Sequence, residues 1–382
     1  MRLRNNKNAI EAVQSISIIK KIAGVCVFTF VDTPNNDVIP KFTVTGLVCF
    51  IFWVSIYCFC AYRAFSDDQT ILRNIYDTKL RQYGDISERV VSSLFFVYGM
   101  WKIPFDTGLT LKYIQIVFEI DRKIEKLGVK IDYDKNALRI FAGTIAQVVA
   151  VATHVLSVWI TLSYLEVSMP IEVIIQVSMA DTLALIITAH ICYYLAHLKE
   201  RYEILNELLL GIRDRNAWQH TVHTVLIRSK APVNSQMVTD YQDKCVSEKI
   251  RAYARIYGLL FKAVQTAEEM YGFALGCTLL FCLFYIVLYL FYFMEATATG
   301  LFHDTSRYIY FLVYVMWQIA YTLGVIFLNI FCSANVVAEA KTASYIVHEI
   351  INEDIGQSIT TEFQGARTIV TLLVILLQFV MD

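Results

Sequence analysis

Residue types that carry catalytic or metal-binding chemistry are present in this chain, but their spacing does not assemble a site. His190 and His197 lie seven residues apart on one helical face, and His220 and His223 lie three apart. Neither pair has a third ligand at metal-binding spacing or an adjacent acid. Phosphate-binding loops, nucleophile elbows and zinc-protease motifs do not occur in the sequence. The sequence therefore predicts no catalytic residues, no metal site, no cofactor and no enzyme activity.

Ionisable groups inside long apolar runs indicate a different kind of chemistry. Asp181 lies in the apolar run 173–198, and His154 lies in the run 140–165. An ionisable group inside a membrane span is costly, so it usually has a partner or a task. We expect Asp181 either to bind a cationic or hydroxylated ligand or to pair with His154 across two antiparallel helices.

Further polar and aromatic side chains fall at a similar depth in these runs. Aromatic walls with a few hydrogen-bonding groups suit small amphipathic molecules such as sugars and alkaloids. For any single aromatic residue, core packing or anchoring at the lipid interface is the alternative. The candidates for lining a ligand pocket are Tyr98, His154, Trp159, Gln176, Asp181, Tyr285, Tyr314, Trp317 and Gln318, with Tyr289 and Tyr310 at the same depth.

Composition and hydropathy predict the elements that carry these residues. Apolar residues make up 57% of the chain and charged residues 18%. A helix of about 20 apolar residues crosses the ~30 Å hydrocarbon core of a bilayer. We therefore predict an all-α, multi-pass membrane protein. Five runs have the required length: residues 42–62, 140–165, 173–198, 263–294 and 308–337.

Two weaker runs bring the predicted number of spans to about seven. Residues 90–111 begin apolar but carry Lys102 and Asp106 four residues apart, on one helical face where they can form an ion pair. The terminal run, residues 368–381, would extend about 21 Å as a helix, which is too short to face lipid alone. It can cross a membrane only where protein shelters it.

The distribution of lysine and arginine predicts a cytoplasmic N-terminus. With the N-terminus inside, 27 of the 33 basic residues lie on the cytoplasmic side and 6 outside. The cytoplasmic parts then include an N-terminal segment, residues 1–41, the segment 102–139, and a long segment, residues 199–262, that is amphipathic at both ends. We expect the fourth and fifth spans to continue into this segment as long helices with a break at residues 230–236, and the sixth span to extend through residues 334–353. The net charge of −1 gives no reason to expect nucleic acid as a partner.

The chain ends in a recognisable pattern, TLLVILLQF. Thr371 is followed after a short apolar stretch by Gln378 and Phe379. This spacing resembles the C-terminal signature of the insect gustatory receptors, which is TY, five apolar residues and QF, with Leu372 in place of the tyrosine. Compared with that family, the approach to the motif is short, because only about twenty residues separate Ile350 from Thr371. Weaker similarities lie at residues 201–206, 253–272 and 338–350.

The resemblance implies a tetrameric ligand-gated cation channel, assembled from this chain alone or with other gustatory receptors, and opened by a small-molecule tastant. Thr371, Gln378 and Phe379 in the last helix, residues 368–382, would then form the pore and gate. Four Phe379 rings can make a constriction that gates by dewetting, and a ring of uncharged Gln378 predicts weak selectivity among cations. The resemblance also implies one transmembrane receptor domain over residues 1–382, in the plasma membrane of chemosensory neurons.

Two alternatives stay open at the level of sequence. An odorant-receptor-like channel subunit would share the topology and the channel architecture. A G-protein-coupled seven-helix receptor would require the N-terminus outside, against the distribution of basic residues.

Overall fold

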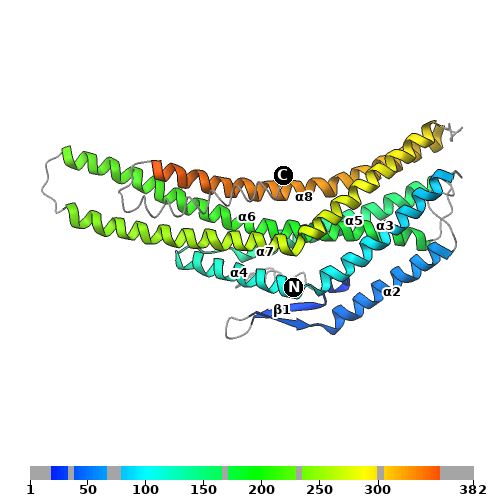
Figure 1. Ribbon diagram of the computed structural model, residues 1–382, viewed down its shortest axis with the longest axis horizontal. Coiled ribbons are helices and arrows are strands. Elements are labelled where there is room, and N and C mark those ends of the chain that lie inside the picture. The colour runs from blue at the N-terminus through cyan, green and yellow to red at the C-terminus, as the bar shows by residue number, and fades with distance from the viewer. Residues whose placement is uncertain are drawn as a thin grey trace. The chain divides into compact units, whose positions relative to one another are not determined.

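The computed structural model describes residues 19–32, 38–66, 79–165, 171–228, 235–298 and 305–352. Within these residues the chain is almost entirely helical, with one short β-hairpin near its start (Figure 1). The predicted all-α class is therefore confirmed, with the hairpin as an addition. The elements are β1 (Phe28–Asp32), β2 (Val38–Phe42), α2 (Val44–Ser66), α3 (Lys79–Phe105), α4 (Thr107–Lys126), α5 (Tyr133–Tyr164), α6 (Ile171–Arg228), α7 (Ser235–Ala298) and α8 (Thr305–Asn352).

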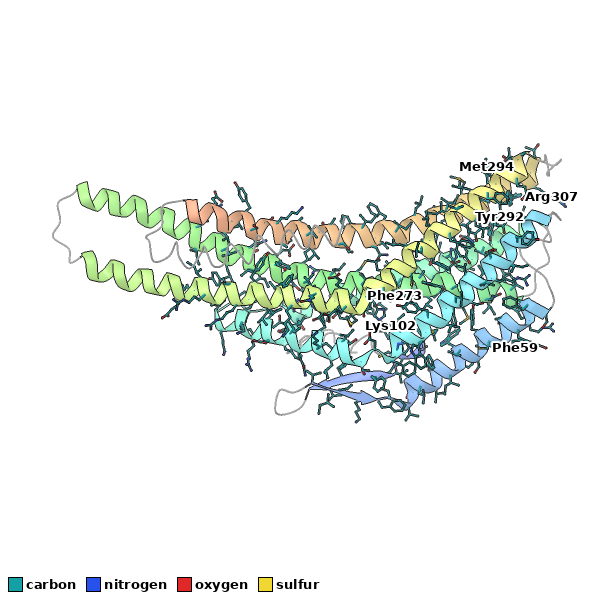
Figure 2. All side chains as sticks on the ribbon, in the orientation of Figure 1. Phe59, Lys102, Phe273, Tyr292, Met294 and Arg307 are labelled. Carbon is teal, nitrogen blue, oxygen red and sulfur yellow. The ribbon has the colours of Figure 1, made fainter. Side chains whose placement is uncertain are left out.

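Five stretches of helix in the described residues are long and apolar enough to cross a membrane: α2, α5, and the segments Ile171–Asp214 of α6, Glu248–Ala298 of α7 and Thr305–Val347 of α8. They coincide with the five long runs predicted from hydropathy. Many of their apolar side chains point outward, as Phe59 does on α2 with 58% of its surface exposed (Figure 2). Such surface is stable in contact with lipid, so the chain is a multi-pass membrane protein.

Three helices continue far beyond the length that a bilayer requires. The helices α6, α7 and α8 have 58, 64 and 48 residues. Their continuity confirms the prediction that the fourth, fifth and sixth spans extend as long helices, while the cytoplasmic location of these extensions stays a prediction. The expected break at residues 230–236 lies largely outside the described residues.

The predicted span at residues 90–111 is wrong at its end, because α3 stops at Phe105 and α4 begins at Thr107. Pro104 has no N–H to donate to the carbonyl of Met100, which weakens the last turn of α3. The predicted ion pair is confirmed, with Lys102 Nζ and Asp106 Oδ2 2.5 Å apart. Since α3 is not among the five apolar stretches, the total of about seven spans stays a prediction.

The hairpin was missed by the sequence analysis, which treated residues 1–41 as a segment without strands. β1 and β2 pair antiparallel, with Phe28 opposite Phe42. Alternating apolar residues on both sides of a Pro-Asn-Asn-Asp stretch were the available signal. The start of α2 lies directly against the chain before β1, since a Cβ on Gly46 would meet the carbonyl oxygen of Cys26.

The described residues group into two compact units. The first contains residues up to Lys112, Asp132–Tyr193 and Glu268–Ile330, and the second contains Tyr113–Ile131, Tyr194–Ala267 and the residues from Phe331 onward. All nine candidate pocket residues belong to the first unit. The helices α6, α7 and α8 each contribute to both units.

Candidate functional site

An acid and a histidine meet in the interior of the first unit. His154 on α5 is fully buried and Asp181 on α6 is 7% exposed, and His154 Nε2 lies 3.1 Å from Asp181 Oδ2. Tyr321 on α8 completes the group, because its ring stacks on His154 with centroids 3.9 Å apart. Its hydroxyl donates a hydrogen bond of 3.3 Å to the backbone carbonyl of Asp181. The predicted pairing of Asp181 with His154 is confirmed.

One nitrogen of this histidine is left over. His154 Nδ1 is buried and has no hydrogen-bond partner among the described residues. An unpaired polar atom inside an apolar bundle is costly unless another molecule completes its hydrogen bond. His154 Nδ1 is therefore an unused donor or acceptor, depending on the tautomer of the ring.

Two further hydrogen bonds connect neighbouring helices in the same interior. Tyr285 on α7 and Ser92 on α3 share a hydrogen bond of 2.5 Å between their hydroxyl oxygens. On α8, Gln318 Nε2 donates to the hydroxyl of Tyr314 over 3.3 Å. Tyr289 on α7 lies edge-on to Tyr314, with ring centroids 6.0 Å apart. All five side chains are buried.

Asp181 and Glu88 lie close enough to these tyrosines to affect them electrostatically. The carboxylate of Asp181 interacts with Tyr285, Tyr314 and Tyr321, which come from both α7 and α8. Glu88 on α3, 9% exposed, has the same kind of effect on Tyr285 and Tyr289 of α7 and on Tyr314 of α8. We refer to the following residues as the polar interior cluster: Glu88, Ser92, His154, Asp181, Tyr285, Tyr289, Tyr314, Gln318 and Tyr321.

The structure brings five of the nine predicted pocket residues into this cluster: His154, Asp181, Tyr285, Tyr314 and Gln318. Trp159 is 51% exposed, at the surface of α5. Tyr98 packs edge-to-face against Phe273 with centroids 5.3 Å apart, and its buried hydroxyl has no partner in the described parts of the chain. The buried indole nitrogen of Trp317 also has no hydrogen-bond partner among the described residues.

Gln176 on α6 is 1% exposed, and neither its amide nitrogen nor its amide oxygen has a hydrogen-bond partner among the described residues. The ring of Tyr310 stacks on Tyr164 with centroids 4.8 Å apart. Contact of any of these residues with a ligand stays a prediction.

Sequence reasoning missed Glu88, Ser92 and Tyr321. Helical spacing was the available signal for Tyr321, because it follows Tyr314 by seven residues and lies on the same helical face. Glu88 and Ser92 are four apart, but only the three-dimensional packing shows that they face Tyr285. Thr371, Gln378 and Phe379 lie outside the described residues, so the pore and gate stay predictions.

Comparison with known protein families identifies the family of this chain. Residues 21–365 match the model of the 7tm chemosensory receptors. This match covers most of the chain, so the protein belongs to the 7tm chemosensory receptor family. It is a chemoreceptor, and its family is one of receptors and channels rather than of enzymes. The match agrees with the resemblance to insect gustatory receptors and ends before the terminal motif. A search of curated proteins found no match.

Proposed function

We propose that this chemoreceptor is a gustatory receptor that acts as a ligand-gated, weakly selective cation channel opened by a small-molecule tastant. The observation that supports a ligand site is the polar interior cluster. It collects two carboxylates, an imidazole and several phenols from helices α3, α5, α6, α7 and α8 in the interior of the first unit. Stable packing alone does not require so many buried polar groups in a membrane span.

A hydroxylated or cationic tastant fits this chemistry best. Its donors can bond to the Asp181 carboxylate, and the aromatic rings can cover its apolar face. The free His154 Nδ1 provides a further hydrogen bond. Because the cluster residues lie on five helices, a ligand that binds several of them favours one arrangement of those helices over another. Differential binding of this kind is how a ligand shifts a channel toward its open state.

The test is a dose–response measurement of tastant-evoked current with Asp181→Asn. We expect the half-maximal concentration to rise tenfold or more with the maximal current unchanged, since a hydrogen bond to a charged group contributes about 1.5–3 kcal/mol. Asp106→Asn is the matched control, because Asp106 pairs with Lys102 and is not part of the cluster. An unshifted dose response in Asp181→Asn would reject the ligand role. A loss of current in proportion to surface protein would assign Asp181 a folding role instead.

The proposal also includes the membrane location, the orientation and the oligomeric state of the receptor. We place the receptor in the plasma membrane of chemosensory neurons, with its N-terminus inside and its C-terminal helix at the axis of a homo- or heterotetramer. The distribution of basic residues supports the orientation. Surface accessibility of tags at the two ends tests it, because an accessible N-terminal tag in intact cells would instead fit a G-protein-coupled receptor. An odorant-type channel subunit would respond to volatile compounds rather than to a tastant panel.

A further inference from the structure

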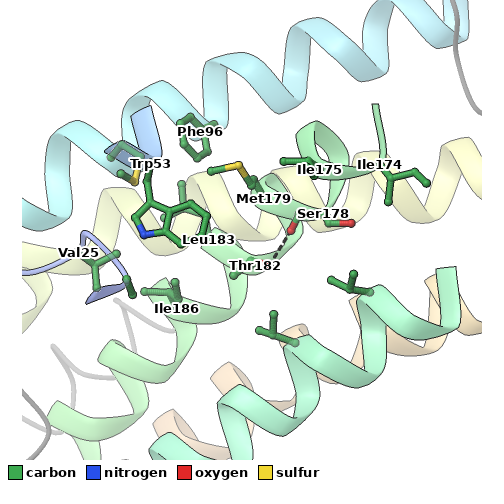
Figure 3. A pocket seen from close by; sticks show the side chains of 14 residues that line it. Val25, Trp53, Phe96, Ile174, Ile175, Ser178, Met179, Thr182, Leu183 and Ile186 are labelled. Carbon is green, nitrogen blue, oxygen red and sulfur yellow. Dashed lines mark hydrogen bonds between the residues drawn. The ribbon is translucent and has the colours of Figure 1, made fainter. Parts of the chain in front are cut away.

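The first unit also contains a partly open, apolar cavity, in contrast to the polar interior cluster (Figure 3). It is a cavity of about 300 Å³ lined by residues of α2, α3, α5 and α6 and of the segment before β1. None of the predicted pocket residues lines it. Its walls are formed by Ala23, Val25, Trp53, Phe96, Met100, Val151, Val155, Ile174, Ile175, Ser178, Met179, Thr182, Leu183 and Ile186.

The wall offers almost no polar contact. No lining residue is charged, and the polar side-chain groups are two hydroxyls and one indole nitrogen. The Thr182 hydroxyl already donates to the backbone carbonyl of Ser178 over 2.6 Å. The indole nitrogen of Trp53 donates to the carbonyl of Ile22 over 2.7 Å. A sugar or an ion would lose its hydration here without gaining hydrogen bonds, so the space suits a hydrocarbon.

The size of the cavity argues against its staying empty. An apolar cavity of about 150 Å³ is already large enough to bind benzene or xenon, and this one has about twice that volume. The atoms that line an empty space lose their dispersion contacts on one side. An occupant of matching chemistry therefore stabilises the unit.

The bilayer is the nearest source of such an occupant. Three of the lining helices, α2, α5 and α6, contain candidate membrane spans. Next to lining residues on two of these helices, Phe52 is 56% exposed and Val149 is 57% exposed, so both face lipid in a membrane. Hydrocarbon chains are thus the medium that surrounds this part of the unit.

We propose that the cavity holds the acyl chain of a membrane lipid, at a site distinct from the polar interior cluster. Trp53, fixed by its bond to Ile22, forms a rigid part of the wall. Met100 and Met179 provide flexible surfaces that adapt to a chain entering at different depths. The proposal does not depend on channel activity or on the identity of the tastant.

The test uses the full-length receptor in nanodiscs that contain a phospholipid with a photoreactive diazirine in its acyl chain. After irradiation, mass spectrometry of peptides locates the label. We expect label on the cavity side of α5 and α6 in the wild type, and a severalfold loss over residues 174–186 in Val151→Phe, which puts an aromatic ring into the space that the acyl chain would occupy. Val149→Phe is the matched control, because it adds the same ring to the exposed face of α5 and should leave this label unchanged. Met179→Ala enlarges the cavity and should retain or increase the label.

Three outcomes would overturn the proposal. The first is a wild-type receptor without label on the lining residues, a result that needs no variant. The second is equal label in the wild type and in a monodisperse Val151→Phe receptor. In the third, lining residues are labelled only when a free diazirine fatty acid is added to nanodiscs of ordinary lipid, which would make the occupant a free amphiphile rather than a bilayer lipid.

Discussion

At the scale of single residues, Gly46 is a position where any side chain would clash with a neighbouring segment of backbone. It lies in the first turn of α2, where a Cβ would meet the carbonyl oxygen of Cys26 and approach the Cα of Val27 to 3.1 Å. These are backbone atoms, so they cannot rotate away as the end of a side chain can. Gly46 therefore lets the helix contact the chain before β1 at close range.

Substitution of Gly46 by alanine should displace this contact. We expect Gly46→Ala to lower the thermal stability of the purified receptor, because small-to-large changes at a packed site cost about 1–3 kcal/mol. Gly143→Ala on α5 is the control, since no atom lies within 4 Å of the added Cβ and alanine favours a helix by about 1 kcal/mol. Equal midpoints of unfolding for the two variants would contradict the close approach.

Residue by residue, the sequence was informative where polarity conflicted with its surroundings. The pairing of Asp181 with His154 could be predicted because each is an ionisable group in an apolar run. Such a group is costly to bury unless it has a polar partner. Trp159 could not be placed, because an aromatic side chain is equally stable facing lipid or protein, and the rotation of α5 about its axis decides between them. The contact of Ser92 with Tyr285 joins residues 193 positions apart, which no local pattern predicts.

At the scale of elements, α4 and α6 are joined in the second unit by a buried ion pair. Arg201 Nε and Nη2 each lie 3.0 Å from an oxygen of Asp121, and both side chains are at most 3% exposed. Arg201 Nη1 also donates to Glu200 over 2.8 Å. Beside this pair, the Tyr113 hydroxyl donates to the carbonyl of Tyr194, and burial raises the pKa of the phenol above its ordinary value. A bidentate ion pair between Arg201 and Asp121 thus connects α4 to α6.

Removal of one partner of this pair should be strongly destabilising. We expect Asp121→Ala to cost about 3–5 kcal/mol, because it leaves the Arg201 guanidinium buried with fewer acceptors. The double variant Asp121→Ala, Arg201→Met should recover part of this loss. Glu203→Ala is the control, since its partner Lys199 is 37% exposed and such surface pairs contribute at most about 1 kcal/mol. Thermal unfolding in detergent measures all four proteins, and a single variant as stable as the control would refute the role of the pair.

Among the elements, the long apolar helices were predictable and the short ones were not. Twenty uncharged residues in a row leave few alternatives to a span, and amphipathic extensions on both sides of residues 229–234 showed that α6 and α7 continue. The boundary between α3 and α4 was missed because Leu109 and Leu111 keep the run apolar beyond Pro104. The strands β1 and β2 have five residues each, and so short a pattern is easily assigned to a loop.

At the scale of the whole molecule, fold class and family follow from features that extend along most of the chain. Several long apolar runs define a multi-pass protein, and the family match over residues 21–365 agrees with them. The geometry of a pore, by contrast, does not follow from features of a single chain. It depends on how several copies meet, and the interactions that decide this lie between chains rather than along one of them.

The pore hypothesis leads to a test on the assembled receptor. We expect Phe379→Ala to increase the leak current without ligand, because it removes the bulky ring from the constriction, and Gln378→Ala to change the permeability ratios among cations. Val380→Ala, next to the motif, is the control. Unchanged leak and selectivity in both motif variants, at normal surface expression, would reject the assignment of Gln378 and Phe379 to the gate.

The division of the chain into two compact units determines which truncated forms of the protein can be useful. Their boundaries at residues 193–194, 267–268 and 330–331 fall inside α6, α7 and α8, and each unit is assembled from three separate stretches of sequence. No single truncation yields either unit intact, and a cut at any of these three boundaries leaves a helix severed in mid-course. Experiments on the polar interior cluster or on the Arg201 pair therefore require the full-length protein, with point substitutions in place of isolated fragments.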